Sequence, residues 1–550
     1  MPPNWYHAPM EPTSFRGLEP VVITSDSPLP EEVFSGYAFL GADLILGPEG
    51  LRLHRKENLQ NLSHHEDGCY FLASPTQSGL RVGSDFKGNC KIFFYRSDNR
   101  WAISNSFIKL VDAVREKSWT VTPVRHVIDS WGVPGRFWDQ CWSYGTSVEE
   151  ISLLPRWGTL EATPSGLAEV DPDPRRNEDD YDAYVEGLAE YLSTWIGRIG
   201  TILKDNSLRV QLELTGGKDS RGVFALFLAA RQYFGVTFDQ HFDLLSSRSE
   251  ARAEDLAIAT DLARTYDIPL NSREFDPGPV TYMSASEQVD WWATFSFGSY
   301  RPVYIVGGRR QLSTIPFGGQ GGEGARQQYE PFTSLHEILN HYRKYFGFEK
   351  SIDAVAEDLS ETSQRIRGWT PRTPEPLAHY QEFRDRFHSG LHPQTRPRVI
   401  PLTGKHLHSS ARNLPDDLLL EGQALRDITA QSAPGLLSRP YEDPRKSPSA
   451  HNLANLAPPL PLSPRLGKVY GEIAGGSPDR PPKESAWSLV LDWFSDAARR
   501  VPEDLVPRKS VQLAQKRAKE APTSTGAATA GPWRPIHHVL LADYVSGGRS

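Results

Sequence analysis

The 550-residue sequence predicts an α/β protein in which an N-terminal β-sandwich precedes a domain built on a parallel sheet. Residues 1–170 hold short apolar runs separated by Gly, Asp-Gly and Asp-Asn turns, which is typical of antiparallel strands. Farther along, the strand-like run Arg209–Leu214 meets a glycine turn and then the apolar, helix-forming run Gly222–Ala230. A strand that leads through a short turn into a helix is the repeating unit of parallel sheets. The length also exceeds that of one typical domain.

The predicted elements divide the chain into four parts. Residues 1–170 form the β domain, 171–182 a charged, proline-bearing linker, 183–504 the α/β domain and 505–550 a partly flexible tail. The strand-like runs of the β domain are Val33–Leu40, Leu44–Leu46, Cys69–Leu72, Leu80–Gly83 and Cys90–Tyr95. In the tail, residues 521–531 are rich in Ala, Thr and Gly, which is typical of a flexible linker.

Helices and strands are predicted to alternate through the α/β domain. A helix over Tyr181–Leu203 has apolar residues at helical spacing and leads to the first strand, Arg209–Leu214. The elements predicted after it are a strand over Gly235–His241, a helix over Glu250–Tyr266, a helix that begins within Ser299–Leu312, a buried strand over Ser313–Phe317 and a helix over Phe332–Phe346.

The loop between the first strand and its helix has the composition of a phosphate site. A helix N-terminus offers free N–H groups and the positive end of the helix dipole, and glycines let the backbone approach an anion closely. Lys218 adds a cation, Ser220 a hydroxyl donor, and Asp219 a carboxylate that can hold Mg²⁺ against phosphate oxygens. The alternative is an ordinary strand–turn–helix corner. The predicted phosphate-binding residues are Thr215, Gly216, Gly217, Lys218, Asp219 and Ser220.

This loop resembles the pyrophosphate loop of the N-type ATP pyrophosphatases, which carries the motif Ser/Thr-Gly-Gly-x-Asp-Ser. The family includes asparagine synthetase, β-lactam synthetase, lasso-peptide cyclases, GMP and NAD synthetases and tRNA-thiolating enzymes. The resemblance implies ATP and Mg²⁺ as cofactors and the activation of a substrate oxygen as an adenylate, with release of pyrophosphate. It makes Lys218 and Arg221 further candidates for pyrophosphate contacts. Kinase-type phosphoryl transfer is disfavoured, because no Gly-x-x-x-x-Gly-Lys-Ser/Thr motif occurs around the loop.

A second glycine-rich loop, residues 318–324, follows the buried strand and reads GGQGGEG. It resembles the Gly-Glu-Gly-Ser-Asp-Glu signature of asparagine synthetase-like domains, which closes over the nucleotide. The resemblance implies nucleotide contacts at Gly319 and Gly321 and a second Mg²⁺ carboxylate at Glu323. Gln320 stands where the family has Glu or Tyr, and an amide that does not ionise cannot act as a general base.

The same loop also spells Gly-x-Gly-x-x-Gly, so a dinucleotide site is an alternative. That site requires an acidic residue at the end of a second strand about 20 residues farther on. The acidic residue Glu337 lies instead within a predicted helix. The synthetase interpretation is therefore preferred.

Two segments of the N-terminal part, Gly83–Asp112 and Gly145–Leu160, resemble parts of class II glutamine amidotransferase domains, which have an Ntn-type β fold. Working members of that class use an N-terminal cysteine, exposed after removal of Met, as nucleophile and base. Position 2 is Pro2 in this chain, and the nearest cysteine is Cys69. The resemblance therefore implies a degenerate amidotransferase-like domain without glutaminase chemistry.

Four further residues are candidates for functional positions of the family. Glu382 and Arg398 are candidates for positioning groups, Glu382 being the catalytic candidate of the two, with surface ion pairs as the alternative. Lys446 is a catalytic candidate beside Asp219, because a late lysine of the family steadies the charge on the pyrophosphate side as the amine attacks. Its alternative is an exposed loop lysine. Asp255 has either a substrate role or the plain role of a carboxylate at a helix N-terminus.

The composition excludes several classes of function. A formal net charge of −8 gives no basic field for nucleic acid. Three distant cysteines without a Cys-x-x-Cys motif give no zinc or iron–sulfur signature and argue against the tRNA-thiolating relatives. No apolar stretch approaches ~20 residues and no signal peptide is evident, so a cytoplasmic protein without membrane contact is expected. Histidine pairs without matching ligands are predicted in surface positions or loops: His64-His65, His406 with His408, and His537-His538.

The resemblance to the asparagine synthetase-like family implies an ATP-dependent, AMP-forming carbon–nitrogen ligase. It is expected to adenylate the carboxylate of a small molecule or peptide, after which an amine displaces AMP. Relatives without the glutaminase cysteine close rings within one molecule, so macrolactam or natural-product amide formation is the preferred hypothesis. A precursor peptide or biosynthetic proteins are the candidate partners. One alternative is ammonia-dependent amidation of the asparagine synthetase type. Another is a catalytically inactive nucleotide-binding protein, because Gln320 replaces a catalytic position.

Overall fold

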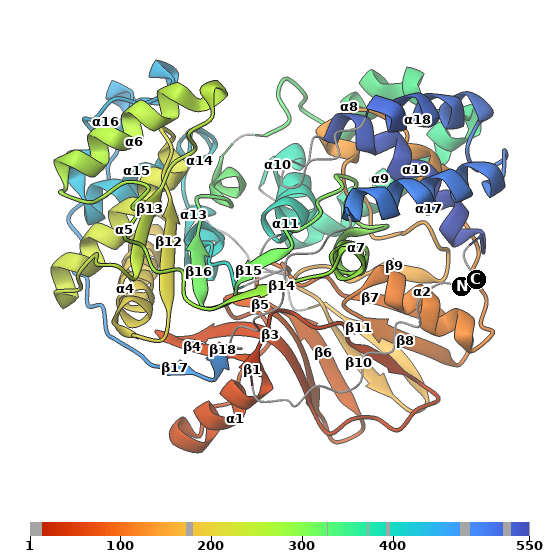
Figure 1. Cartoon of the computed structure of the whole chain (residues 1–550), viewed down its shortest axis with the longest axis horizontal. Helices are drawn as coiled ribbons and strands as arrows, with labels where there is room; N and C mark the ends of the chain where they lie inside the picture. Colours follow the sequence, from red (N-terminus) through yellow and green to blue (C-terminus); the bar gives the residue numbers. More distant parts are fainter. Residues whose placement is uncertain are drawn as a thin grey trace.

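The computed structural model describes residues 14–171, 180–326, 328–370, 373–391, 397–473, 485–520 and 530–548, and it is a mixed α/β structure. Figure 1 shows two lobes above a broad base of β-strands. One lobe surrounds a parallel sheet, and the other consists mainly of helices. Among the described residues, no helix combines the length and the apolar composition that crossing a bilayer requires. Position 2, most of the linker 171–182 and residues 521–529 lie outside the described residues.

The base is formed by one seven-stranded and one four-stranded sheet. The strands of the larger sheet, in spatial order, are β11 (Gly166–Val170), β10 (Thr159–Thr163), β6 (Leu80–Ser84), β5 (Gly68–Pro75), β3 (Val33–Leu40), β4 (Asp43–Leu46) and β17 (Val469–Tyr470). The smaller sheet has the order β2 (Val22–Thr24), β8 (Arg100–Ser104), β7 (Phe93–Ser97) and β9 (Ile151–Leu153). All neighbours are antiparallel except β17, which joins β4 in parallel. The strands predicted from the N-terminal sequence are confirmed within a few residues.

Two short strands bring late residues back to the N-terminal part of the chain. Besides β17, β18 (Glu472–Ile473) pairs in parallel with β1 (Ser14–Phe15). The helices among the N-terminal strands are α1 (Gly47–Asn58), α2 (Phe107–Glu116) and α3 (Arg125–Ser130). Chain segments more than 400 residues apart in sequence therefore share one sheet.

The predicted parallel sheet is present, with β12 (Arg209–Glu213) between β13 (Phe242–Leu245) and β16 (Thr314–Phe317). Single parallel bridges at Leu270 and Val399 extend it on the two sides. From β12 the chain first moves outward to β13 and Leu270, and it then returns to β16 on the opposite side. The strand order thus reverses between β12 and β16. In open α/β sheets, ligands bind at the carboxyl ends of the strands beside such a switch point.

Two helices connect the parallel sheet to its surroundings. Helix α5 (Lys218–Phe234) follows β12 directly and buries Val223, Phe224 and Phe227. The N-cap of helix α4 (Tyr181–Lys204) is Asp180, whose side chain accepts a hydrogen bond from the N–H of Ala183. An N-cap of this kind satisfies one of the free donors at a helix start. The remaining helices of this lobe are α6 (Ala253–Thr265), α13 (Lys405–Ala411), α14 (Asp416–Glu421), α15 (Gln423–Ser432) and α16 (Ala450–Ala454).

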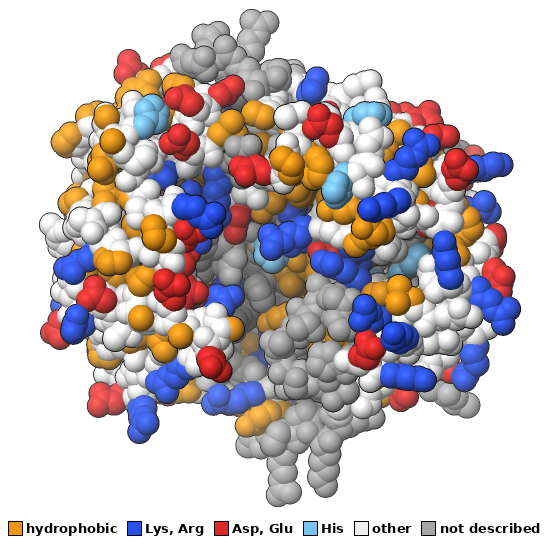
Figure 2. Space-filling view, turned by 90° about the horizontal axis from the view of Figure 1, so that it is seen from above, with side chains coloured by type: hydrophobic (Ala, Val, Ile, Leu, Met, Phe, Trp, Pro, Cys, Tyr) orange, Lys and Arg blue, Asp and Glu red, His pale blue; other side chains and the backbone are white. Residues whose placement is uncertain are grey.

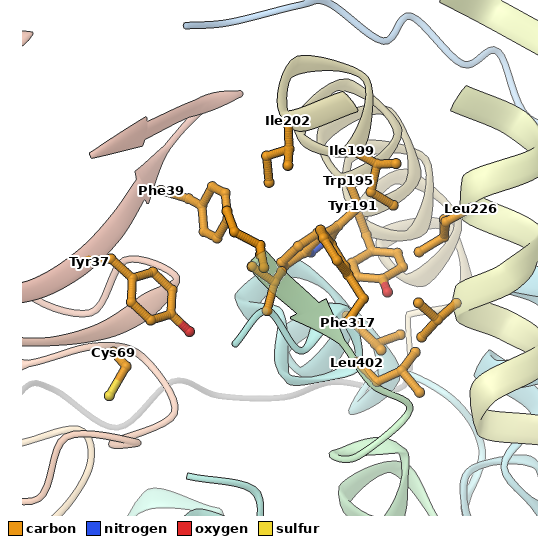
Figure 3. Close-up of a cluster of buried hydrophobic side chains, with 14 of the residues drawn as sticks. Tyr37, Phe39, Cys69, Tyr191, Trp195, Ile199, Ile202, Leu226, Phe317 and Leu402 are labelled. Atoms are coloured by element: carbon orange, nitrogen blue, oxygen red, sulfur yellow. The ribbon is translucent and has the colours of Figure 1, made fainter. Parts of the chain in front are cut away.

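One hydrophobic core joins the base to the parallel sheet. Figure 3 shows Phe39 of β3 close to Trp195 of α4, and their ring centroids are 5.4 Å apart. Phe317 of β16 belongs to the same buried cluster. Burial of large aromatic side chains on both sides stabilises this contact and fixes one sheet relative to the other.

A second hydrophobic core lies in the helical lobe. It combines residues of β7, β8 and α2 with helices that come much later in the chain. Those helices are α7 (Ala285–Ser296), α8 (Leu335–Tyr342), α9 (Glu349–Trp369), α10 (Glu375–Glu382), α11 (Arg384–Ser389), α17 (Ala486–Arg500), α18 (Arg508–Glu520) and α19 (Ala530–Val545). Trp533 and Leu540 of α19 are fully buried, so the described part of the predicted tail belongs to the packed structure.

Two predicted elements are wrong. The strand predicted over Gly235–His241 is irregular, because α5 runs on to Phe234 and Gly235 ends it in the left-handed conformation (φ 63°). The strand begins only at Phe242. No helix begins in the described segment Ser299–Leu312, which instead contains the short strand β15 (Arg309–Gln311), paired with β14 (Val280–Tyr282). The proline and two glycines of that segment disfavour a helix.

Candidate functional site

The two glycine-rich loops meet at the carboxyl ends of β12 and β16. A Cβ atom on Gly319 would lie 2.6 Å from the backbone nitrogen of Ser220, and one on Gly322 would lie 2.5 Å from Oδ1 of Asp219. The first distance, to backbone, leaves no room for a Cβ atom, and the second would require Asp219 to move, so glycine allows the close approach of the second loop to the first turn of α5. The structure therefore brings together two loops that are separated by about 100 residues and places them at the switch point of the sheet.

Hydrogen bonds that involve the side chains of Thr215 and Ser220 connect the first loop to the start of α5. The backbone N–H of Thr215 donates to Oγ of Ser220 at 3.1 Å, and the two hydroxyls lie 2.9 Å apart. The N–H of Gly217, the N-cap of α5, donates to Oγ1 of Thr215 at 3.3 Å. These contacts hold the turn in a fixed shape at the positive end of the helix dipole.

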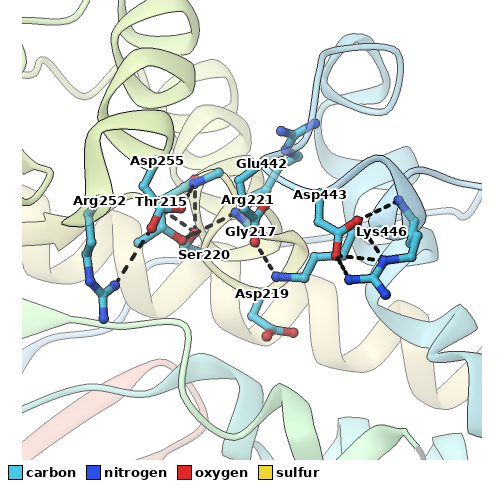
Figure 4. A network of polar contacts seen from close by, with 12 residues as sticks. Thr215, Gly217, Asp219, Ser220, Arg221, Arg252, Asp255, Glu442, Asp443 and Lys446 are labelled. Atoms are coloured by element: carbon cyan, nitrogen blue, oxygen red, sulfur yellow. Dashed lines mark hydrogen bonds and ion pairs between the residues drawn. The ribbon is translucent and has the colours of Figure 1, made fainter. Parts of the chain in front are cut away.

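Two carboxylates of the protein lie against the glycines of this loop. Oδ1 of Asp255 accepts the N–H of Gly216 at 2.8 Å. A Cβ atom on Gly217 would lie 3.4 Å from Oε1 of Glu442, so this carboxylate also lies over the loop. Figure 4 shows Asp255 and Glu442 on opposite sides of the loop, with Lys446 beyond Glu442. The carboxylate oxygens of Asp255 and Glu442 therefore occupy the place beside a helix N-terminus where anions bind.

Cations gather around the same loop. Burial, together with the charges of Arg326 and Arg426 and a smaller effect of Lys446, lowers the pKa of Lys218 to about 8. Positive groups that repel one another around a helix N-terminus are stabilised by a bound anion. Figure 2 shows the surface hollowed between the two lobes, with Lys and Arg side chains along its walls.

Asp219 and Glu323 form a pair of carboxylates between the loops. Burial raises the pKa of Asp219, whose Oδ1 is buried without a hydrogen-bond partner. Burial, together with the charges of Asp219 and Asp385, raises the pKa of Glu323 to about 7. Arg326 compensates the pair, because its Nη2 donates to Oδ2 of Asp219 at 3.0 Å and lies 3.9 Å from Glu323.

These carboxylates fit a Mg²⁺ ion bound together with phosphate. No group of three or more His, Cys, Asp and Glu side chains that could hold a metal occurs within the part of the chain that the structure describes. Mg²⁺ at nucleotide sites typically needs only one or two carboxylates, because phosphate and water oxygens complete its octahedron. The unpartnered Oδ1 of Asp219 and the raised pKa of Glu323 are the features that a cation would relieve.

The side chain of Gln320 is held by a buried arginine. Nη2 of Arg398 donates to Oε1 of Gln320 at 3.2 Å, and Nη1 donates to Oε1 of Glu213 at 3.0 Å. Arg398 is 2 % exposed, so the alternative of a surface ion pair is wrong for it. It joins the end of β12 to the second loop, as a positioning group would.

The other predicted catalytic residues lie in different surroundings. Lys446 forms an ion pair with Glu442 and thus lies beside the first loop. Glu382 is fully buried and binds two arginines, at 3.2 Å to Arg156 and 3.3 Å to Arg386. These contacts tie α10 to the N-terminal part, so the alternative of a surface ion pair is wrong for Glu382 as well.

Arg221 does not face the loop, and its predicted pyrophosphate contact is wrong. It is fully buried and donates to the backbone carbonyls of Leu436 (3.0 Å) and Arg439 (2.9 Å). Its guanidinium also lies 3.6 Å from the ring centroid of Tyr441. Arg221 therefore fixes the segment that carries Glu442. Neither Glu442 nor Arg326 was predicted. Glu442 reaches the first loop from a segment more than 200 residues away, and Arg326 follows the second loop by two residues with no motif that marks it.

The dinucleotide alternative is not supported by the geometry. A dinucleotide fingerprint needs a glycine loop that opens a helix. The second loop opens only a 3₁₀ turn over Gly322–Ala325, and Glu337 lies in α8 rather than after a strand.

No protein-family model matches this chain, and no curated protein matches it. The site must therefore be interpreted from its residues.

Proposed function

We propose that the protein is an ATP-dependent, AMP-forming carbon–nitrogen ligase of the asparagine synthetase-like type. The observation that carries the proposal is the meeting of two glycine loops at the switch point of a parallel sheet, with Asp219 and Glu323 paired between them. A helix N-terminus, several cations and two carboxylates within one site suit a metal–polyphosphate complex.

Each group of the site has a role in holding Mg-ATP. The N–H groups of Gly216 and Gly217 bind phosphate oxygens after Asp255 and Glu442 have given up their positions on the loop. Lys218 and Lys446 neutralise the leaving pyrophosphate. Thr215 and Ser220 hold the turn, and Gly319 and Gly321 let the second loop approach the nucleotide.

Mg²⁺ supplies charge neutralisation and orientation of the phosphates. Asp219 and Glu323 are the residues that would hold it. Arg326 compensates both carboxylates, so it would have to leave Asp219 for a metal and would then be available to contact phosphate.

In the proposed reaction a substrate carboxylate oxygen attacks the α-phosphorus of ATP, and the bond to pyrophosphate breaks. An amine then attacks the activated carbonyl carbon, loses a proton and displaces AMP, which leaves an amide. The protein contributes mainly orientation and electrostatic stabilisation. Gln320 cannot take the proton, because an amide does not ionise at neutral pH and its oxygen is held by Arg398.

The cysteines support an amine other than glutamine as the nitrogen source. Cys69, Cys90 and Cys141 are all buried, and burial raises the pKa of each thiol. A buried, protonated thiol is a poor nucleophile. This argues against glutamine as the nitrogen source. Between free ammonia and an amine of the substrate itself we favour the substrate amine, as in macrolactam or natural-product amide formation, because the relatives that lack the glutaminase cysteine close rings within one molecule. A cytoplasmic setting, which supplies Mg-ATP, belongs to this proposal.

A nucleotide-binding protein without activity is the second candidate, favoured by Gln320 and by the carboxylates on the loop. Product analysis separates the two. The protein is incubated with Mg-ATP and pooled amino acids, peptides and small carboxylic acids, and nucleotides are resolved by chromatography. A ligase forms AMP with at least one pool, whereas ATP bound but unchanged in every pool would support the inactive protein. ADP as the product would contradict the proposal.

A further inference from the structure

A lysine of the N-terminal part reaches the second glycine loop. Lys87 follows β6, and its side chain is only 2 % exposed. Its ammonium forms an ion pair with Asp385 of α11 and lies 3.4 Å from Nε2 of His408 of α13. Asp385 and His408 are 1 % and 3 % exposed. A segment of the N-terminal part and two segments about 300 residues later therefore converge on one buried cation, which the proposed reaction does not yet use.

This cluster lies directly against the turn that carries Glu323. A Cβ atom on Gly324 would lie 2.7 Å from His408, 3.1 Å from Nζ of Lys87 and closer still to Asp385. The carbonyl of Gly324 accepts a hydrogen bond of 2.7 Å from Nε2 of Gln381. On its other side, at Gly322, the same turn touches Asp219. The turn is thus held between the carboxylate of the first loop and the Lys87 cluster.

The positive charge of Lys87 compensates the buried carboxylate of Asp385. Asp385 is almost completely buried, and a buried carboxylate without a partner is strongly destabilising. Removal of Lys87 would leave the buried carboxylate of Asp385 without its cation, directly beside Gly324 of the second loop.

We propose that Lys87 is a positioning residue of the nucleotide site, through which the N-terminal β part holds the Gly322–Ala325 turn and compensates Asp385. Its effect on catalysis rests on the proposed function, while its effect on the turn rests on geometry alone. The N-terminal part is then a component of the synthetase site and not only a scaffold for it.

The test compares Lys87→Met with Lys91→Met in the full chain. Lys91 is a matched control, because it lies in the same segment, is equally buried, and donates to the carbonyl of Asn89 at 2.9 Å. We expect amide hydrogen exchange of peptides covering 318–326 to become about tenfold faster in Lys87→Met and to stay unchanged in Lys91→Met. ATP–pyrophosphate exchange at saturating ATP should fall by about 10- to 100-fold, with a higher Mg²⁺ requirement, as for other partners that orient metal ligands.

A double variant separates positioning from plain stability. Lys87→Met/Asp385→Asn removes both charges, so it should fold even if Lys87→Met does not, and it should regain most of the lost exchange activity. Unchanged hydrogen exchange of the loop in Lys87→Met would overturn the inference, as would equal losses of activity in Lys87→Met and Lys91→Met. If the wild-type protein shows no ATP–pyrophosphate exchange, the proposed function fails, and hydrogen exchange of the loop still decides the role of Lys87.

Discussion

Arg326 donates a hydrogen bond of 3.0 Å to the carboxylate of Asp219, so a residue from beyond the second glycine loop neutralises the first turn of α5. The same guanidinium lies 3.9 Å from Glu323. An arginine that compensates two carboxylates takes the electrostatic role that a divalent cation has at a nucleotide site. A metal bound by these carboxylates would compete with this side chain for Asp219.

The first prediction follows from that competition. Arg326→Gln removes the positive charge that competes with a metal, so the nucleotide-free protein should bind Mn²⁺, a probe for Mg²⁺, about tenfold more tightly. Electron paramagnetic resonance measures free Mn²⁺ directly. The matched control is Arg365→Gln, which removes an arginine that pairs with Glu169 and Asp171 instead. Equal or weaker Mn²⁺ binding in Arg326→Gln would contradict this role of Arg326.

The contact between the loops predicts that Gly319 cannot carry a side chain. Gly319→Ala places a Cβ atom 2.6 Å from the backbone of Ser220, so the loops must separate. We expect a loss of about 1–3 kcal/mol in the free energy of unfolding and loss of ATP binding. Gly368→Ala is the control, since Gly368 lies in α9 with no atom within 4 Å of the added Cβ. It should leave stability unchanged or raise it by up to about 1 kcal/mol.

Arg221 is predicted to act through the segment that it holds. Arg221→Lys loses the planar fork that binds the carbonyls of Leu436 and Arg439, and an ammonium cannot replace it. Denaturant unfolding should give a destabilisation of about 2–4 kcal/mol, because buried carbonyls lose charged donors. Arg231→Lys, at an exposed position of the same helix, should cost under about 0.5 kcal/mol. Similar values for both variants would mean that Arg221 does not fix this segment.

Buried histidines predict loss of stability in mild acid. Burial lowers the pKa of His537 to about 3, well below the ordinary value of 6.5. Between these values the unfolded chain binds a proton that the folded chain does not, so stability falls as the pH drops below 6.5. His537→Gln removes one such group and should reduce the slope of unfolding free energy against pH by up to about 1.4 kcal/mol per pH unit. An unchanged slope between pH 6.5 and 4 would show that His537 is not neutral in the folded protein.

The sequence predicted those parts of the site that depend on local order. The strand, the two glycines and the helix start that define the first loop all lie within about ten residues of sequence. The same pattern predicts the parallel sheet. The contacts of Gly216 with Asp255 and of Asp219 with Arg326 arise from packing between distant segments, which no local pattern encodes.

The errors in the predicted fold have physical reasons of the same kind. Residues Val236–Phe238 have the composition of a strand, but Phe238 stacks on Phe242 at 4.3 Å and the segment remains irregular. The His537-His538 pair was expected at the surface, and both residues are buried. His537 is satisfied by the carbonyl of Arg301 (2.8 Å) and the N–H of Gly298 (3.3 Å), which lie more than 200 residues away. Likewise, α19 is held by a core to which early strands contribute.

The measurement that tests the central claim most directly is ATP–pyrophosphate exchange with Mg²⁺ and the substrate pools, for the wild-type protein, Asp219→Ala and Asp496→Ala. Asp496 is an exposed residue of α17 that pairs with Arg499 and serves as the control. We predict that one pool supports exchange, that Asp219→Ala lowers it at least about 100-fold, and that Asp496→Ala leaves it unchanged. Exchange that survives in Asp219→Ala, or a wild-type protein that neither exchanges pyrophosphate nor binds Mg-ATP, would contradict the assignment of the two loops as a pyrophosphate site.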